Sequence, residues 1–206
     1  MSARIILVRH GRSGHVHTGW IDAAGFQRWR DAYDAAGLLP GERPPPALEA
    51  LARQAGVVVA SDLPRARASA ELLVPGAEIP TSALLREMEQ PIPPLGDARV
   101  PLAVWALAIG LRKALGALRG EALPAAALRR AGEAAGWLIE LAAERGDVLA
   151  VTHAWFREVL AAALVERGWR RACASGRHAR WTRYARWRRY AHWSAWTLID
   201  ARQPGP

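Results

Sequence analysis

The sequence predicts an α/β domain of three layers, in which helices cover both faces of a mostly parallel central sheet. Three runs of aliphatic residues carry this prediction: 5–8, 57–60 and 148–152. Strands buried on both faces read as continuous apolar runs, and segments with helical spacing or helix stop signals lie between these three. Ligands of open α/β sheets collect at the carboxyl ends of the strands, so polar residues that follow these runs are the first candidates for a site.

Length and composition favour one domain spanning 1–206, because 206 residues with 51 % hydrophobic content can bury a sizeable core. Cys173 is the only cysteine, which excludes an intrachain disulfide and fits a reducing compartment. The apolar stretch at the amino end is too short for a signal peptide. No apolar run reaches the roughly 20 residues of a membrane-spanning helix. We therefore expect a cytoplasmic location.

The first strand ends in a polar cluster. Residues 5–8 are followed directly by Arg9, His10, Gly11 and Arg12. Two guanidiniums beside an imidazole repel one another unless an anion lies between them. Their field is expected to lower the pKa of His10, which keeps the imidazole neutral and leaves a nitrogen lone pair for attack on phosphorus.

Two helices are expected between the first strand and the second. Residues 23–36 place apolar side chains at helical spacing, and Gly37 ends that helix. Pro46 is suited to the first turn of another helix, which continues toward Ala55.

A third helix should begin directly after the strand at 57–60. Ser61 or Asp62 can cap it, and Pro64 suits its first position. Arg65 then lies in the first turn, where free backbone N–H groups favour a phosphate and an Arg adds a bidentate clamp. The alternative is a solvent-exposed surface charge.

The strand at 148–152 repeats the arrangement of the first strand, because His153 follows it directly. Imidazoles at the ends of two strands can meet, one attacking phosphorus and the other donating hydrogen bonds to the phosphoryl oxygens. A helix at 155–167 and a strand at 196–199 are expected to complete the sheet.

These residues resemble the signature of the histidine phosphatase superfamily, also called phosphoglycerate mutase-like. The superfamily pattern has an Arg-His-Gly loop after the first strand, an Arg after a second strand, a central acidic residue and a His after a late strand. All four occur here in that order: Arg9-His10-Gly11, Arg65, Glu87 and His153. The resemblance covers roughly residues 4 to 200 and implies the phosphoglycerate mutase-like form of the three-layer fold.

The resemblance implies hydrolysis of a small phosphomonoester through a phosphohistidine. His10 would attack phosphorus, Arg9, Arg65 and His153 would bind the phosphoryl oxygens, and Glu87 would protonate the leaving oxygen and then activate water. Auxiliary phosphate contacts are expected from Ser13 and Arg12. No metal and no cofactor is expected, since the Arg and His groups supply the charge that magnesium supplies elsewhere.

Several positions depart from the superfamily pattern. Val16 stands where many relatives have an Asn, and His15 or His17 can replace that contact. These two histidines lack the accompanying carboxylates or cysteines of a metal site. The Gly-x-Trp-Glu-Gly continuation after Glu87 is absent, so the substrate does not follow from the resemblance, and Glu89 is an alternative acid.

Residues 88–122 occupy the position in the sequence at which members of this family insert a lid over the pocket. They include an expected apolar helix at 101–118, and a further helix is expected from Pro124 to Arg145. Three interpretations are open for the apolar helix: a packed cap, a dimer face and a membrane-surface contact. The packed cap is favoured, because uniformly apolar helices are usually buried. The oligomeric state does not follow.

The net charge of +9 is concentrated in the segment 166–193, which has nine Arg and one acidic residue between Glu166 and Tyr190. From Arg180 onward, Arg and aromatic residues recur every third position. Residues 177–193 could bind nucleic acid or an anionic membrane surface, contact substrate, or pack on themselves. The sequence leaves these interpretations open.

Two other functions are open as well. A phosphomutase of the same superfamily must retain the phosphorylated intermediate, and such members tend to have a polar, basic lid, so the apolar insertion favours hydrolysis. A non-catalytic module could bind anionic partners through the Arg/aromatic segment. The presence of His10, Arg65 and His153 together disfavours that second alternative.

Overall fold

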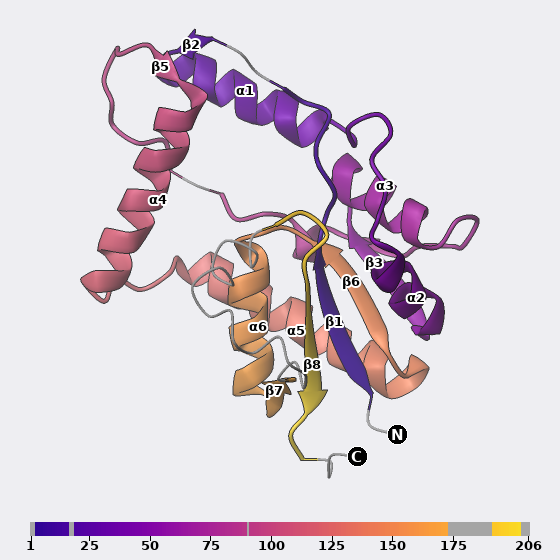
Figure 1. Cartoon of the computed structure of the whole chain (residues 1–206). Helices are drawn as coiled ribbons and strands as arrows, with labels where there is room; N and C mark the ends of the chain where they lie inside the picture. Colours follow the sequence, from indigo (N-terminus) through magenta and orange to yellow (C-terminus); the bar gives the residue numbers. More distant parts are fainter. Residues whose placement is uncertain (1–2, 17–18, 90, 173–190, 203–206) are drawn as a thin grey trace, which may run out of the picture.

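A computed structural model describes residues 3–16, 19–89, 91–172 and 191–202. Its centre is a six-stranded sheet in the order β4-β3-β6-β1-β8-β7 (Figure 1). The strands of this sheet are β1 (Arg4–Arg9), β3 (Val57–Ser61), β4 (Thr81–Ser82), β6 (Val148–Thr152), β7 (Trp169–Arg171) and β8 (Ala195–Asp200). The short strands β2 (Trp20–Ile21) and β5 (Val100–Pro101) form a separate antiparallel pair.

The pairing of the strands confirms a mostly parallel sheet. β6 lies between β1 and β3 and is parallel to both, and β4 adds a further parallel strand beside β3. β8 lies on the other side of β1 and is antiparallel to it, and β7 is antiparallel to β8. The carboxyl ends of β3, β6 and β1 therefore meet at one edge of the sheet, as the runs of aliphatic residues predicted.

Helices cover both faces of the sheet and confirm the three layers. The helices are α1 (Ala23–Ala35), α2 (Pro46–Gln54), α3 (Pro64–Leu73), the 3-10 helix η1 (Ala83–Leu85), α4 (Leu102–Leu118), α5 (Ala125–Arg145) and α6 (Phe156–Glu166). Along β1, Ile5 and Leu7 pack with α5 and α6, while Ile6 and Val8 pack with α2 and α3. Both faces of β1 are thus buried, which explains its uninterrupted aliphatic sequence.

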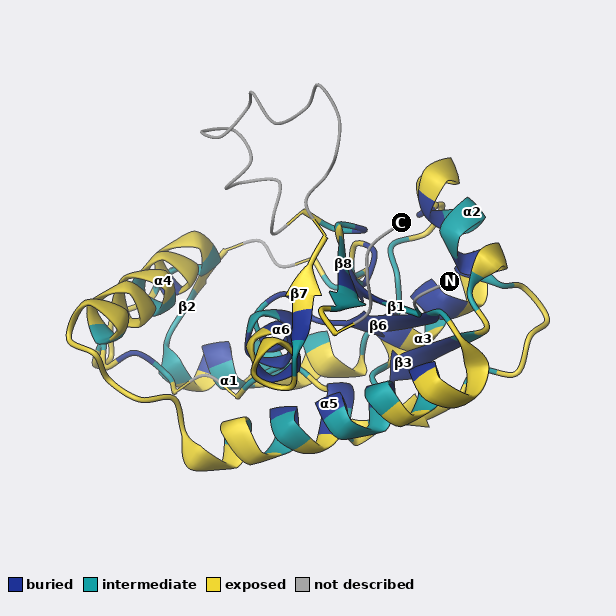
Figure 2. Cartoon of the chain, turned by 90° about the horizontal axis from the view of Figure 1, so that it is seen from below, coloured by how far each residue is buried: buried dark blue, intermediate teal, exposed yellow. Residues whose placement is uncertain are grey.

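The apolar helix α4 differs from its expected packing. It lies at the periphery, away from the central sheet, and most of its surface is exposed (Figures 1 and 2). Trp105 is fully buried, whereas large apolar residues such as Leu107 and Leu111 face solvent. The favoured interpretation as a packed cap is therefore wrong for most of this helix.

Much of the Arg/aromatic segment, residues 173–190 with Cys173, lies outside the described residues. The predicted partners of 177–193 therefore stay predictions. Within the described ranges, no helix is both long enough and apolar enough to cross a membrane.

Candidate active site

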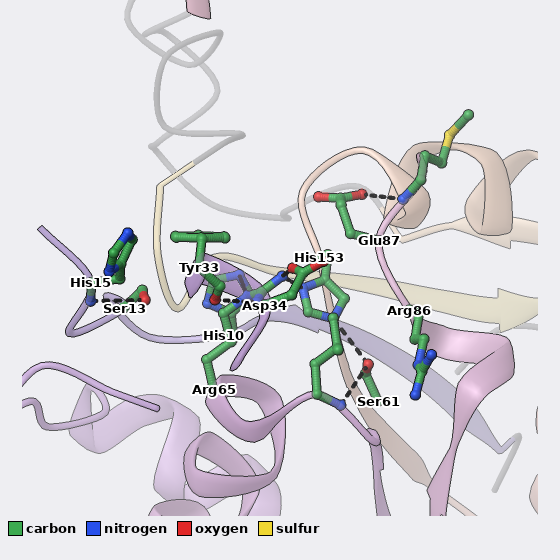
Figure 3. Close-up of polar contacts among 12 residues, drawn as sticks. His10, Ser13, His15, Tyr33, Asp34, Ser61, Arg65, Arg86, Glu87 and His153 are labelled. Atoms are coloured by element: carbon green, nitrogen blue, oxygen red, sulfur yellow. Dashed lines mark hydrogen bonds and ion pairs between the residues drawn. The ribbon is translucent and has the colours of Figure 1, made fainter. Parts of the chain in front are cut away.

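Three of the predicted site residues meet at the carboxyl edge of the sheet (Figure 3). His10 follows β1, His153 follows β6, and Arg65 lies in the first turn of α3 after β3. The rings of His10 and His153 have centroids 5.0 Å apart. All three side chains are buried, with exposed fractions of 2 % for His10, 1 % for Arg65 and 0 % for His153.

The hydrogen bonds of His10 determine which ring nitrogen is free. Its Nδ1 lies 2.6 Å from the Gly11 carbonyl oxygen, and Arg65 Nε donates to its Nε2 at 3.3 Å. A carbonyl oxygen only accepts and a guanidinium only donates. Nδ1 therefore carries the proton, and the lone pair of Nε2 faces Arg65.

In His153 the hydrogen bonds place the proton on the other ring nitrogen, Nε2. Arg65 Nη2 donates to its Nδ1 at 3.3 Å, so that nitrogen is unprotonated in this state. The Nε2–H then donates to the hydroxyl oxygen of Ser61 at 2.9 Å. Arg65 thus bridges the two imidazoles with separate N–H groups.

Arg65 is itself held by the end of α1. Its Nη1 donates to the Tyr33 carbonyl oxygen at 2.9 Å, and its Nη2 donates to Asp34 Oδ1 at 3.0 Å. The guanidinium also lies 4.3 Å from the centre of the Tyr33 ring. These contacts fix the plane of the guanidinium against the two histidines.

Ser61 has another role than the predicted one. The residue before α3 is Leu63, and no side chain caps this helix, although Pro64 does occupy its first turn as expected. The predicted cap by Ser61 or Asp62 is wrong. The Ser61 hydroxyl instead orients His153, while Asp62 forms an ion pair with Arg86.

The loop that carries His10 is covered by residues 192–194. A Cβ atom on Gly11 would lie 2.6 Å from Cζ2 of Trp193, so only glycine lets that ring pack against the loop. Trp193 Nε1 donates to Glu42 at 2.8 Å. His192 Nδ1–H donates to the carbonyl oxygen of His10 at 3.2 Å. The Gly of the Arg-His-Gly motif therefore serves close packing.

The same segment is tied to the sheet through its backbone. The N–H of Arg9 donates to the Ser194 carbonyl oxygen at 3.0 Å, and the N–H of Trp193 donates to the Arg9 carbonyl oxygen at 3.1 Å. Arg157, buried in α6, donates to the carbonyl oxygen of Ser194 and, at 3.0 Å, to its hydroxyl. Residues 192–194 thus form a fixed cover over the His10 loop.

Burial is the largest cause of the shifts in the histidine pKa values. It lowers the pKa of both His10 and His153 well below 6.5, and the positive charges of Arg65 and Arg9 lower both further. The pKa of His10 is lowered, as predicted from the neighbouring arginines, but desolvation contributes more to the shift than the charges of those arginines do. Burial likewise lowers the pKa of Arg9, although the Tyr33 hydroxyl and Glu87 act in the opposite direction. Both imidazoles are therefore neutral near pH 7.

This burial predicts a loss of stability in acid. Between the lowered pKa of the folded state and 6.5, the unfolded chain binds protons that the folded chain does not. The free energy of unfolding should then fall by about 1.4 kcal/mol per pH unit for each histidine. Urea unfolding at a series of pH values from neutral to mildly acidic measures this slope.

The variant His153→Gln serves as the control, since it removes one titrating group. Its pH slope should be smaller than that of the wild-type chain even if its stability at neutral pH is lower. An unchanged slope, or a wild-type stability that rises in acid, would contradict neutral burial of His153.

Three predicted residues of the first loop lie in other environments. Arg12 forms an ion pair with Glu42 at 2.9 Å instead of pointing to the histidine cluster. The hydroxyl oxygen of Ser13 accepts from the N–H of His15 at 3.2 Å. The ring of His15 lies 5.9 Å from that of Trp29. The structure therefore does not bring Arg12 and Ser13 into the cluster as auxiliary contacts, and His17 lies outside the described residues.

Glu87 lies at the amino end of α6, near His153 (Figure 3). Its carboxylate accepts hydrogen bonds from the N–H groups of Met88, Trp155 and Phe156 at 2.9 to 3.3 Å. Its charge acts on Arg9. Glu89 is exposed. Of the two predicted acids, Glu87 is therefore the one beside the site.

Arg130 of α5 positions the segment that carries Glu87, which the sequence did not indicate. It donates to the carbonyl oxygens of Leu84, Arg86 and Glu87 at 2.6 to 3.3 Å. Its guanidinium also lies 4.1 Å from the centre of the Phe156 ring. An Arg in the second turn of an amphipathic helix gives no sequence signal for such a contact.

The fold and the site define the class of protein: an α/β protein in which two buried imidazoles and the buried guanidinium of Arg65 meet at the ends of parallel strands. Within the described ranges, no group of three or more His, Cys, Asp and Glu side chains could hold a metal ion. The cluster itself can bind a tetrahedral oxyanion and present a nucleophilic nitrogen to it.

The chain is similar to solved phosphatase structures. Phosphoserine phosphatase from Entamoeba histolytica, in complex with 3-phosphoglyceric acid, is 17 % identical over 79 % of this chain and 80 % of that chain, with a TM-score of 0.47. A mycobacterial glucosyl-3-phosphoglycerate phosphatase is 20 % identical over 80 % and 83 %, with a TM-score of 0.46. No protein-family model and no curated protein matches the chain.

Proposed function

We propose that the chain is a phosphomonoester hydrolase of the histidine phosphatase superfamily, acting through a phosphohistidine on His10. The observation that carries the proposal is the Nε2 lone pair of His10, buried beside Arg65 and within 5.0 Å, ring to ring, of His153. A neutral imidazole between cationic groups is suited to attack an anionic phosphoryl group, because those cations stabilise the charge on its oxygens.

In the first step, Nε2 of His10 attacks phosphorus, an N–P bond forms and the P–O bond to the leaving group breaks. Arg9 and Arg65 bind the phosphoryl oxygens, and the Arg65 N–H groups that now contact the two histidines turn to these oxygens. Glu87, having taken up a proton, gives it to the leaving oxygen. In the second step Glu87 takes a proton from water, which attacks phosphorus, breaks the N–P bond and releases phosphate.

His153 gains its role as a donor when the substrate enters. In the free protein its Nδ1 is unprotonated, and the charges of Arg65 and Arg9 lower its pKa. A phosphoryl dianion offsets those charges and raises the pKa of His153. Proton uptake at Nδ1 then provides an N–H donor for a phosphoryl oxygen, while Ser61 keeps the ring in place.

The test is release of inorganic phosphate from a panel of phosphomonoesters, with and without a chelator, combined with trapping of the phosphorylated protein. We expect turnover that the chelator leaves unchanged and a phosphoprotein that is labile in acid and stable in base. Transfer of the phosphoryl group to an acceptor rather than to water would favour the mutase alternative. If the chelator abolished turnover, the proposal would be contradicted. Turnover without any detectable phosphoprotein would contradict it as well.

A further inference from the structure

One side of α4 presents a continuous apolar surface to solvent, which we call the α4 face. Its large residues are spaced three or four apart and so form one stripe along the helix. Their exposed fractions run from 39 % to 83 %. They are Val104, Leu107, Leu111, Leu115 and Leu118. Ala103 and Ala114, which flank this stripe on one edge, are small and exposed.

The opposite side of α4 is anchored to the rest of the molecule. Trp105 stacks on Phe26 with ring centroids 4.9 Å apart, and its Nε1 donates to the Ile21 carbonyl oxygen at 3.1 Å. Lys113 forms an ion pair with Glu158 at 2.8 Å and lies 4.9 Å from the centre of the Trp155 ring. These contacts fix the rotation of the helix, so the α4 face points away from the protein.

Further apolar side chains are exposed near both ends of the helix. Trp20, 64 % exposed, pairs with Pro101, the residue that immediately precedes α4. Leu123, 41 % exposed, follows the carboxyl end. Exposed apolar patches of this extent mark sites of interaction, whereas single exposed residues do not. Figure 2 shows α4 and β2 side by side at the edge of the molecule, with α4 almost entirely exposed.

The charges around the α4 face determine which partner fits it. No acidic residue occurs between Asp97 and Glu121, and the cations in this interval are Arg99, Arg112, Lys113 and Arg119. Lys113 is paired with Glu158 on the opposite side of the helix and Arg119 lies 3.7 Å from Glu121, whereas Arg112 is exposed beside the leucine stripe. A second copy of the chain would bring two such basic helices together, and the net charge of +9 adds to that repulsion. An anionic surface is complementary to the same charges.

We propose that the α4 face docks on the surface of an anionic lipid bilayer. The helix lies flat, with its leucines in the boundary between headgroups and acyl chains and its Arg side chains at the phosphates. Its 17 residues extend along the surface rather than through the bilayer. Trp20 adds an amphipathic ring at the same depth, as is usual at such interfaces.

The test is co-sedimentation of the full chain with vesicles of phosphatidylcholine alone and of phosphatidylcholine mixed with phosphatidylglycerol, at low and high salt. We expect binding to the mixed vesicles, weakened by salt and by omission of phosphatidylglycerol. The variant Leu107→Gln/Leu111→Gln should lower the partition coefficient at least about tenfold. Arg112→Gln/Arg119→Gln should reduce the dependence on phosphatidylglycerol.

The matched control is Leu72→Gln/Val165→Gln, which removes two exposed apolar side chains from α3 and α6. It should bind the vesicles like the wild-type chain, and thermal melting should show that all three double variants are folded. Equal binding by the Leu107→Gln/Leu111→Gln variant would place the contact elsewhere and overturn the proposal. The proposal would also be overturned if the wild-type chain formed a dimer and did not bind vesicles, and if the Leu107→Gln/Leu111→Gln variant were monomeric.

Discussion

Replacing His10 by alanine is expected to lower kcat/KM for phosphomonoesters by at least about a thousandfold, because the group that forms the N–P bond is removed. The remaining guanidiniums and His153 can still bind a phosphoryl group, so binding of a phosphate ester should persist. Trapping with a labelled substrate should give no phosphoprotein. Steady-state kinetics and isothermal titration with inorganic phosphate separate the two effects.

His10 is buried, and its ring lies 5.6 Å from that of His192, so its replacement is expected to weaken the loop as well. The variant His10→Gln, which fills more of the space, should show the same loss of activity with a smaller loss of thermal stability. His15→Gln is the matched control from the same loop, since His15 packs on Trp29 outside the cluster, and it should keep most of the activity. Turnover that survives both His10 substitutions would remove the phosphohistidine from the mechanism.

The second large effect is expected at Arg65. Arg65→Gln should lower kcat about 100- to 1,000-fold, the usual cost of losing a donor that stabilises transition-state charge. Arg65→Lys should rescue little, because an ammonium cannot contact His10, His153 and the phosphoryl oxygens in one plane. The guanidinium is 1 % exposed and has partners on α1, so stability should fall as well.

Arg67→Gln is the control for Arg65, because Arg67 lies on the same helix and is exposed. It should change neither kcat nor the melting temperature by much. If Arg65 acted only by holding the fold, kcat measured well below the melting temperature would be close to that of the wild-type chain. Such a result would contradict its proposed role in binding the phosphoryl group.

The sequence identified the parts of the site that depend on strand ends. Runs of β-branched residues have few structural alternatives to a buried strand, and parallel strands bring their carboxyl ends to one edge. His10, Arg65 and His153 could therefore be expected to converge. Their partners could not, since Asp34 is 31 residues from Arg65 and Ser61 is 92 residues from His153. Such contacts depend on how α1 and β3 pack, which local patterns do not encode.

The error over α4 has a similar cause. A helix that is apolar on almost all sides gives no periodic signal for which side is covered, so burial was the default. The structure shows that Trp105 anchors the helix while the leucine stripe is exposed. In α5, Leu128 has the helical spacing of the packed face but is 49 % exposed, because it lies near the first turn, before the residues that contact the core.

The cover that residues 192–194 form over the His10 loop joins segments that are far apart in the order of synthesis. The ribosome makes His10 among the first residues of the chain, whereas β8 and the indole of Trp193 are made almost two hundred residues later. Until then β1 lacks its antiparallel neighbour and the His10 loop lacks its cover. The proposed hydrolase activity is therefore expected to begin only after the ribosome has synthesised β8.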